Sequence, residues 1–278
     1  MARSTGSRQV RIALIDGPIV ADHPDLSQTS IEPVSRSGHV TCSVIGSAAC
    51  LHATFVAGIL IGKRGSAAPA ICPDCTLLVR PIFAEVARGG HSPLTSTSPS
   101  SLSEALIQCM NAGANIINLS LALQMPAPRE QHELAEALNQ AARRGVIVVA
   151  AAGNQGAIAS SIITRHPWVI PVAACDLHGR PMNTSNLGGS IGRRGLSAPG
   201  DNIVSLGVEG SSSTFTGTSV ATPFVTGAIA LLWSQFPAAT SAEIRLAISR
   251  ATARRTSIIP PLLNVAAASR TLLESGAN

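Results

Sequence analysis

A serine at the start of a long apolar segment is the residue of this chain best placed to act as a nucleophile. Ser219 lies in residues 217–223, with the sequence GTSVATP, and an apolar run with helical spacing continues to Phe236. A helix that begins here would present unpaired N–H groups and partial positive charge to the serine. The hydroxyl could attack a carbonyl while backbone donors receive the developing charge. An ordinary N-cap serine gives the same pattern, so Ser219 alone only suggests catalysis.

Three further residues supply the partners that such a serine would need. Asp16 ends a short apolar run from Arg11, the pattern of a buried strand with a carboxylate at its C-terminal end. His52 stands at the start of a second apolar helix, and Asn154 follows a third apolar run. A histidine can act as a general base, and an asparagine amide is a good donor to an oxyanion.

The four segments together resemble the signatures of the subtilases, the subtilisin-like serine peptidases, over roughly residues 10–250. The order Asp, His, Ser along the chain is that of the subtilisin triad. Residues 22–26, DHPDL, extend the similarity around Asp16, and residues 16–18, 79–83 and 113–118 are similar to the cyanobactin-maturation proteases. The resemblance implies a three-layer α/β fold, with a mostly parallel central sheet and helices on both faces.

The resemblance also implies a role for each residue. Ser219 would attack the scissile carbonyl, His52 would accept its proton and pass it to the leaving amine, and Asp16 would orient the imidazole. Asn154 and the Ser219 N–H group would form the oxyanion hole. Taken one at a time, the residues also fit a core histidine, a turn carboxylate and a loop amide.

Residues 118–123 resemble the strand on which subtilases bind an extended substrate. Ala122 and Leu123 stand where the family usually has glycines, and their side chains should narrow the cleft. We therefore expect selective cleavage. The expected substrate-binding residues are Leu119, Ser120, Leu121, Ala152 and Gly153.

The cysteines and the loop after the expected histidine helix bear on metal binding. A Cys72–Cys75 or a Cys42–Cys50 disulfide is possible, although buried thiols are the default for all six cysteines. No second Cys-x-x-Cys or histidine pair completes a zinc site. Residues 62–72 do not resemble the family's calcium loop, so we expect no metal and no cofactor.

The composition limits the classes of partner. Hydrophobic residues make up 45% of the 278 residues and charged residues 13%, as suits buried parallel strands. The net charge of +5 comes from scattered arginines, and there is no tyrosine, which argues against nucleic acid as a partner. No secretion signal and no apolar run of membrane-spanning length are present. We expect a cytoplasmic protein that binds a peptide or protein substrate and no membrane.

The organisation predicted along the chain is a flexible tail over residues 1–9 and one catalytic domain over residues 10–278. A low-complexity segment at residues 89–100 is expected to be a surface loop that borders the cleft. Strands are predicted at 10–15, 76–79, 115–119, 146–150, 169–173 and 202–206, and helices at 54–61, 103–111, 130–143, 220–235 and 242–251.

Three functions compete. A serine endopeptidase that works through an acyl-enzyme is favoured. A peptide ligase or macrocyclase would use the same acyl-enzyme, but the short interval between Asp16 and His52 leaves no room for a helical insertion that shields it from water. A catalytically silent peptide-binding module would not need all four chemical groups.

Overall fold

Seven parallel strands form the central sheet, in the order β2-β3-β1-β4-β5-β6-β7. The computed structural model describes residues 4–35, 40–86, 97–121, 128–250 and 257–276. The strands of this sheet are β1 (Arg11–Asp16), β2 (Ser30–Pro33), β3 (Thr76–Pro81), β4 (Ile116–Leu119), β5 (Ile147–Ala151), β6 (Val169–Cys175) and β7 (Leu196–Pro199).

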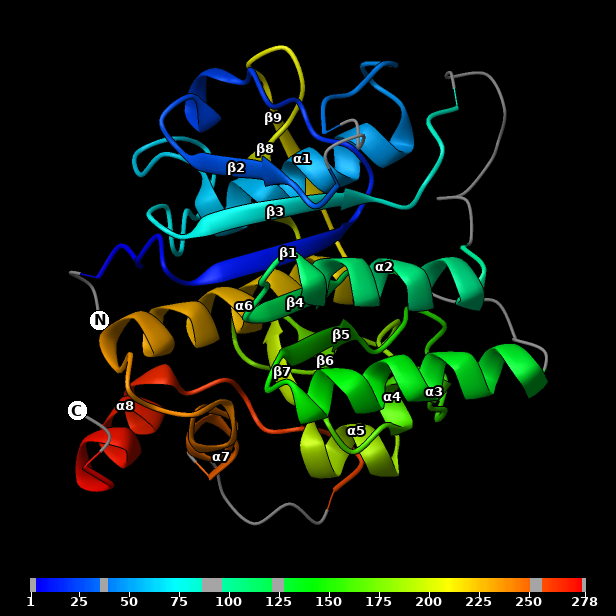
Figure 1. The fold of residues 1–278 in the computed structure, drawn as a ribbon, viewed down its shortest axis with the longest axis vertical. Helices are drawn as coiled ribbons and strands as arrows, with labels where there is room; N and C mark the ends of the chain where they lie inside the picture. The colour runs from blue at the N-terminus through cyan, green and yellow to red at the C-terminus, as the bar shows by residue number, and fades with distance from the viewer. Residues whose placement is uncertain (1–3, 36–39, 87–96, 122–127, 251–256, 277–278) are drawn as a thin grey trace.

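Helices cover both faces of the sheet (Figure 1), so the predicted α/β layered fold is confirmed. One face packs against the long apolar helices that carry His52 and Ser219, and the other face packs against two amphipathic helices. The helices are η1 (Pro24–Leu26), α1 (Ala48–Ile61), α2 (Pro99–Asn111), α3 (Pro128–Arg143), α4 (Ile162–Arg165), α5 (Gly189–Arg194), α6 (Thr218–Gln235), α7 (Ser241–Arg250) and α8 (Val265–Glu274).

Strand β1 shows how the sheet assigns side chains to the two faces. Ile12 and Leu14 point into the core that includes α1 and α6, whereas Ala13 and Ile15 point into the core that includes α2 and α3. This alternation is the period of two expected of a strand with both faces buried. Asp16, at the C-terminal end of β1, continues the series of Ile12 and Leu14. Its carboxylate is therefore directed to the face that α1 covers.

The structure differs from the sequence prediction at several elements. The strand predicted at residues 202–206 is β8 (Ile203–Leu206), which pairs with β9 (Ser212–Phe215) in a separate antiparallel hairpin. Helix α1 begins at Ala48 rather than at residue 54, because Ser47 caps it by accepting from the Cys50 N–H group. Strands β2, β7 and β9 and helices α4, α5 and α8 were not predicted.

The N-terminal segment is bonded to the domain from residue 4 onward, although it was expected within a flexible tail. Thr5 O accepts from the Asp74 N–H group at 2.8 Å, and Arg8 O accepts from the Thr76 hydroxyl at 2.9 Å. Most of the segment at 89–100 lies outside the described residues. In the part of the chain that is described, every helix is too short or too polar to cross a membrane.

A glycine at position 17 allows helix α1 to pack closely against the chain at the end of β1. A Cβ atom at Gly17 would lie 2.3 Å from the backbone oxygen of Ala49, in the first turn of α1. The backbone oxygen of Ala49 cannot move aside for a Cβ atom as the end of a flexible side chain could. Gly17 thus allows the helix that carries His52 to approach Asp16.

We predict that Gly17→Ala lowers the free energy of unfolding by about 1–3 kcal/mol, because α1 must move away from β1. Urea denaturation measures the change. Gly189→Ala is the matched control, since a Cβ there meets only side-chain atoms of Arg193 at 3.8 Å or more. An equal loss of stability in both variants would contradict the proposed close approach.

Candidate active site

Asp16 and His52 form a buried pair that joins β1 to α1. His52 Nδ1 lies 2.9 and 3.0 Å from the two carboxylate oxygens, and Asp16 is fully buried. The Gly17 N–H group also donates to Asp16 Oδ1 at 2.8 Å. These contacts provide the buried carboxylate with the partners that a charge needs in the interior. They also fix the neutral imidazole with its proton on Nδ1.

The environment of His52 acts on its pKa in two directions. Burial of the ring lowers the pKa of His52, whereas the negative field of Asp16 and the hydrogen bond to its carboxylate raise it. The contributions of Asp16 are larger together, so the pKa of His52 lies above its usual value. Asp16 therefore stabilises the imidazolium that a general base becomes when it accepts a proton.

The second ring nitrogen of His52 is buried, and it has no hydrogen-bond partner among the described residues. It is therefore not bonded to the hydroxyl of Ser219 in this structure. The ring lies against Phe215 of β9, with 6.2 Å between the ring centroids. A buried acceptor without a partner is costly in most proteins. In catalytic sites the bond from base to nucleophile often closes only when substrate binds.

Ser219 is the second residue of α6, and its N–H group remains available. Thr218 N donates to Asn154 Oδ1 at 2.8 Å, while Val220 N and Ala221 N donate to Gly217 O at 3.1 and 3.2 Å. The Ser219 N–H group has no hydrogen-bond partner among the described residues. Gly217 makes the sharp entry into the helix possible, because its φ of 143° is unfavourable for other residues.

Asn154 faces the start of α6 from the loop after β5. Its Oδ1 atom accepts from the backbone N–H of Thr218 and, at 3.0 Å, from the Thr218 hydroxyl. Thr218 Oγ1 in turn accepts from the Gly153 N–H group at 3.1 Å. Because Oδ1 is held in this way, the NH2 group of the exposed Asn154 side chain is left to donate to a ligand. The sequence prediction for Asn154 and Ser219 is compatible with this arrangement.

A series of hydrogen bonds among buried polar side chains holds the backbone carbonyl of Ser219. Pro223 lacks the N–H group that would bond to the Ser219 carbonyl within the helix. The Ser120 hydroxyl donates to that carbonyl instead, at 3.0 Å. Asn118 Nδ2 donates to Ser120 Oγ, and Thr226 Oγ1 donates to Asn118 Oδ1, both at 2.8 Å.

Sequence reasoning missed the roles of Asn118 and Thr226, and it assigned Ser120 to substrate binding. The available signal was a polar residue within each of two otherwise apolar stretches, residues 116–119 and 225–233. Leu119 was also expected to bind substrate, but its side chain is fully buried between the sheet and α2 and α3. Its backbone pairs with Ile15 and Ala150. Residues 122 and 123, expected to narrow the cleft, lie outside the described residues.

A cavity of about 230 Å³ is lined in part by Gly153 and Gln155, the neighbours of Asn154 in the chain. Its lining includes three of the predicted substrate-binding residues, Leu121, Ala152 and Gly153. Gln155 and Asn186 add amides to the wall, and Asn186 Nδ2 donates to Gln155 Oε1 at 2.6 Å. The described residues that line this cavity are all uncharged.

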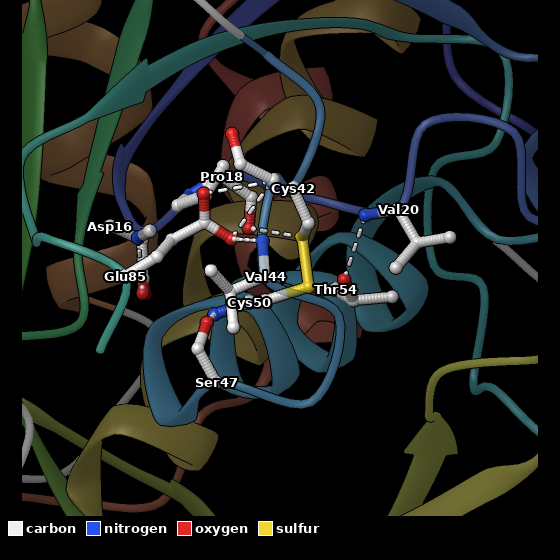
Figure 2. The surroundings of a disulfide bond; sticks show 11 residues. Asp16, Pro18, Val20, Cys42, Val44, Ser47, Cys50, Thr54 and Glu85 are labelled. Atoms are coloured by element: carbon white, nitrogen blue, oxygen red, sulfur yellow. Dashed lines mark hydrogen bonds between the residues drawn. A yellow bond between two sulfur atoms is a disulfide. The ribbon is translucent and has the colours of Figure 1, made fainter. Parts of the chain in front are cut away.

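The cysteines form one disulfide in the described chain, between Cys42 and Cys50 (Figure 2). Cys72 and Cys75 are buried free thiols, so the alternative pairing is not formed. Glu85 lies close enough to the bridged sulfurs to suggest a metal site among the described residues. Disulfide sulfurs are not thiolates, however, and these residues do not fit a metal ion.

Comparisons with known proteins identify the family of this chain. The Subtilase family profile matches residues 7–270. Subtilisin BL of Lederbergia lenta is 31% identical over 248 residues, which cover 87% of this chain and 82% of that protein.

Two solved cyanobactin maturation proteases share the structure. A serine-to-alanine mutant of the protease domain of PatA has a TM-score of 0.86 and 28% identity, with 99% of both chains covered. The prenylagaramide maturation protease PagA has a TM-score of 0.83 and 27% identity, with 98% of this chain and 96% of that chain covered. The chain belongs to the subtilase family and is a subtilisin-like serine endopeptidase.

Proposed function

We propose that this protein cleaves selected peptide substrates through an acyl-enzyme, with Asp16, His52 and Ser219 as its triad. The buried Asp16–His52 pair is the observation that carries the proposal, because it leaves an unprotonated nitrogen without a partner. That nitrogen is where a general base must accept a proton. The likeness to two maturation proteases supports a precursor peptide as the substrate.

Each residue has a defined task in this mechanism. Ser219 Oγ attacks the scissile carbonyl carbon while its proton passes to His52 Nε2. The Nδ1–H group keeps its bond to Asp16, which stabilises the positive imidazolium. The Ser219 N–H group and the Asn154 NH2 group donate to the oxyanion, and the proton on Nε2 then passes to the leaving amine. Water, activated by the same nitrogen, releases the acid.

Hydrolysis is favoured over ligation by the elements between Asp16 and His52. The described residues of this interval form only η1, β2 and the beginning of α1. None of these is a helical insertion that could cover the acyl-enzyme and exclude water.

The reaction is tested first with a fluorophosphonate probe, read by intact mass. We predict one adduct on the wild-type protein and none on Ser219→Ala, whose kcat/KM for peptide hydrolysis falls by at least about 10⁴-fold. An adduct of equal yield on Ser219→Ala would show that another residue reacts. No adduct on either protein would contradict the proposed nucleophile.

The pH dependence tests the role of Asp16. His52 must be neutral to accept a proton, and its pKa is raised above the usual 6.5. The kcat/KM value should therefore fall as the pH decreases through a midpoint above 6.5. In Asp16→Asn, burial still lowers the pKa of His52, but the negative charge that opposes it is gone. We predict that the pKa of His52 in this variant, measured by NMR titration of the imidazole, falls below 6.5.

Asp176→Asn is the matched control, because Asp176 pairs with Arg180 at the surface. Its His52 titration should equal that of the wild type. A His52 pKa in the wild type at or below 6.5 would contradict the coupling to Asp16.

The uncharged cavity lined in part by Gly153 and Gln155 predicts selectivity at the residue before the cleaved bond. A charged side chain would lose water there without gaining a counter-charge, so peptides with Leu or Met should exceed those with Lys or Glu by at least about 10-fold in kcat/KM. Gln155→Glu should raise kcat/KM for the peptide with Lys at this position by about 10-fold and lower kcat/KM for the peptide with Glu. Unchanged ratios in this variant would exclude the cavity as the specificity pocket.

A further inference from the structure

The loop at residues 40–47 is attached to the chain that follows Asp16. Ile19 forms an isolated parallel bridge with Thr41, in which Ile19 N donates to Val40 O at 2.8 Å and Cys42 N donates to Ile19 O at 3.0 Å. Movement of this loop is thereby linked to the segment that leaves the end of β1.

The carboxylate of Glu85 holds the next residues of the loop (Figure 2). Ser43 N lies 2.8 and 3.0 Å from the two carboxylate oxygens, and Val44 N donates to Oε1 at 2.9 Å. Glu85 follows β3, the neighbour of β1 in the sheet. The loop is therefore held on both sides of Cys42 by the segments that follow β1 and β3.

The disulfide connects this loop to α1. Cys42 is half-buried at the surface, whereas Cys50 is buried in the first turn of the helix, two residues before His52. Two further contacts join α1 to the chain after Asp16. Ala49 packs on Gly17, and Val20 N donates to Thr54 Oγ1 at 3.0 Å. The three contacts of α1 lie just before and just after His52.

The first turn of α1 has little other support. Ser47 caps it, but no acidic residue stands in that turn to interact favourably with the helix dipole. Apart from the covalent link, the start of α1 is held by its cap, by the packing of Ala49 on Gly17 and by the bond between His52 and Asp16. A displacement of about 1 Å at a catalytic group can cost about 10²-fold in rate.

We propose that the Cys42–Cys50 disulfide is a redox-controlled positioning device for the Asp16–His52 pair. The inference rests on the proposed function and adds a means of regulation to the same site. A cellular thiol, as its thiolate, would attack the sulfur of the half-buried Cys42 and release Cys50 as a thiolate, which takes up a proton. A second thiol then resolves the mixed disulfide, so that two electrons and two protons reduce the bridge while two thiols become one disulfide.

The test compares the oxidised protein with the same protein reduced by dithiothreitol. We expect reduction to lower kcat by about 10-fold or more with KM changed less than about 2-fold, and oxidised glutathione to restore kcat. The pKa of His52 should fall, because Asp16 is the charged group that raises it and a looser pair relaxes toward the usual value or below. A Cys42→Ser, Cys50→Ser double variant should have the kcat and the His52 pKa of the reduced protein, and dithiothreitol should change neither.

A second double variant, Cys72→Ala, Cys75→Ala, is the matched control, since it removes the other closely spaced cysteines and keeps the bridge. It should respond to the reductant as the wild type does. The proposal is wrong if reduction lowers the melting temperature but leaves kcat and the His52 titration unchanged, or if the control variant loses the response.

Failure of the proposed function gives a different result. In that case the fluorophosphonate probe labels neither redox state. The NMR titration of His52 still reports whether the bridge positions the Asp16–His52 pair, because it requires no catalysis. A redox-independent titration would overturn the inference whatever the activity.

Discussion

The burial of a carboxylate at the end of β1 is the constraint on which the site depends. A charge in the interior must be paired and hydrogen-bonded, and Asp16 meets this need through His52 and the Gly17 N–H group. The requirement fixes where α1 lies, since its first turn must approach close enough to bring His52 to Asp16. A glycine at position 17 makes that approach possible. The same contact raises the pKa of the histidine and sets its tautomer. Packing and chemistry are thus satisfied by one interaction.

The start of α6 is positioned by a different means. Thr218 engages Asn154 on the cleft side, and Ser120 bonds to the carbonyl that Pro223 leaves free on the core side. Helix α6 lies on the same face of the sheet as α1, so that Ser219 and His52 come from neighbouring helices. The order of strands in the parallel sheet places β1, β4 and β5 side by side. Asp16 ends β1, and the chain after β4 and β5 supplies Ser120 and Asn154.

The sequence predicted the layered fold and the chemical groups better than it predicted how they are held. Strands such as β1, β5 and β6 are buried on both faces, and their continuous apolar runs are easy to recognise. Short elements such as β2 and β9 are half-exposed and lack that signal. The start of α1 was missed because its cap is a single serine, and the contacts of Ser120 and Leu119 were not predicted because they depend on which neighbour each atom meets. Pairing of Cys42 with Cys50 depends on tertiary approach, which spacing alone leaves open.

Ser219 and His52 are held in position by different kinds of contact. Ser219 is held by hydrogen bonds among buried side chains, and Asn118 and Thr226 lie deep in the core. A change at the surface therefore does not directly contact Asn118 or Thr226. His52 lies on a helix whose first turn meets a surface loop, and a covalent bridge between loop and helix replaces the buried network found on the serine side. The bridge is also the one link that a thiol can break without unfolding the core. Chemical control over the site is therefore expected to be more effective at His52 than at Ser219.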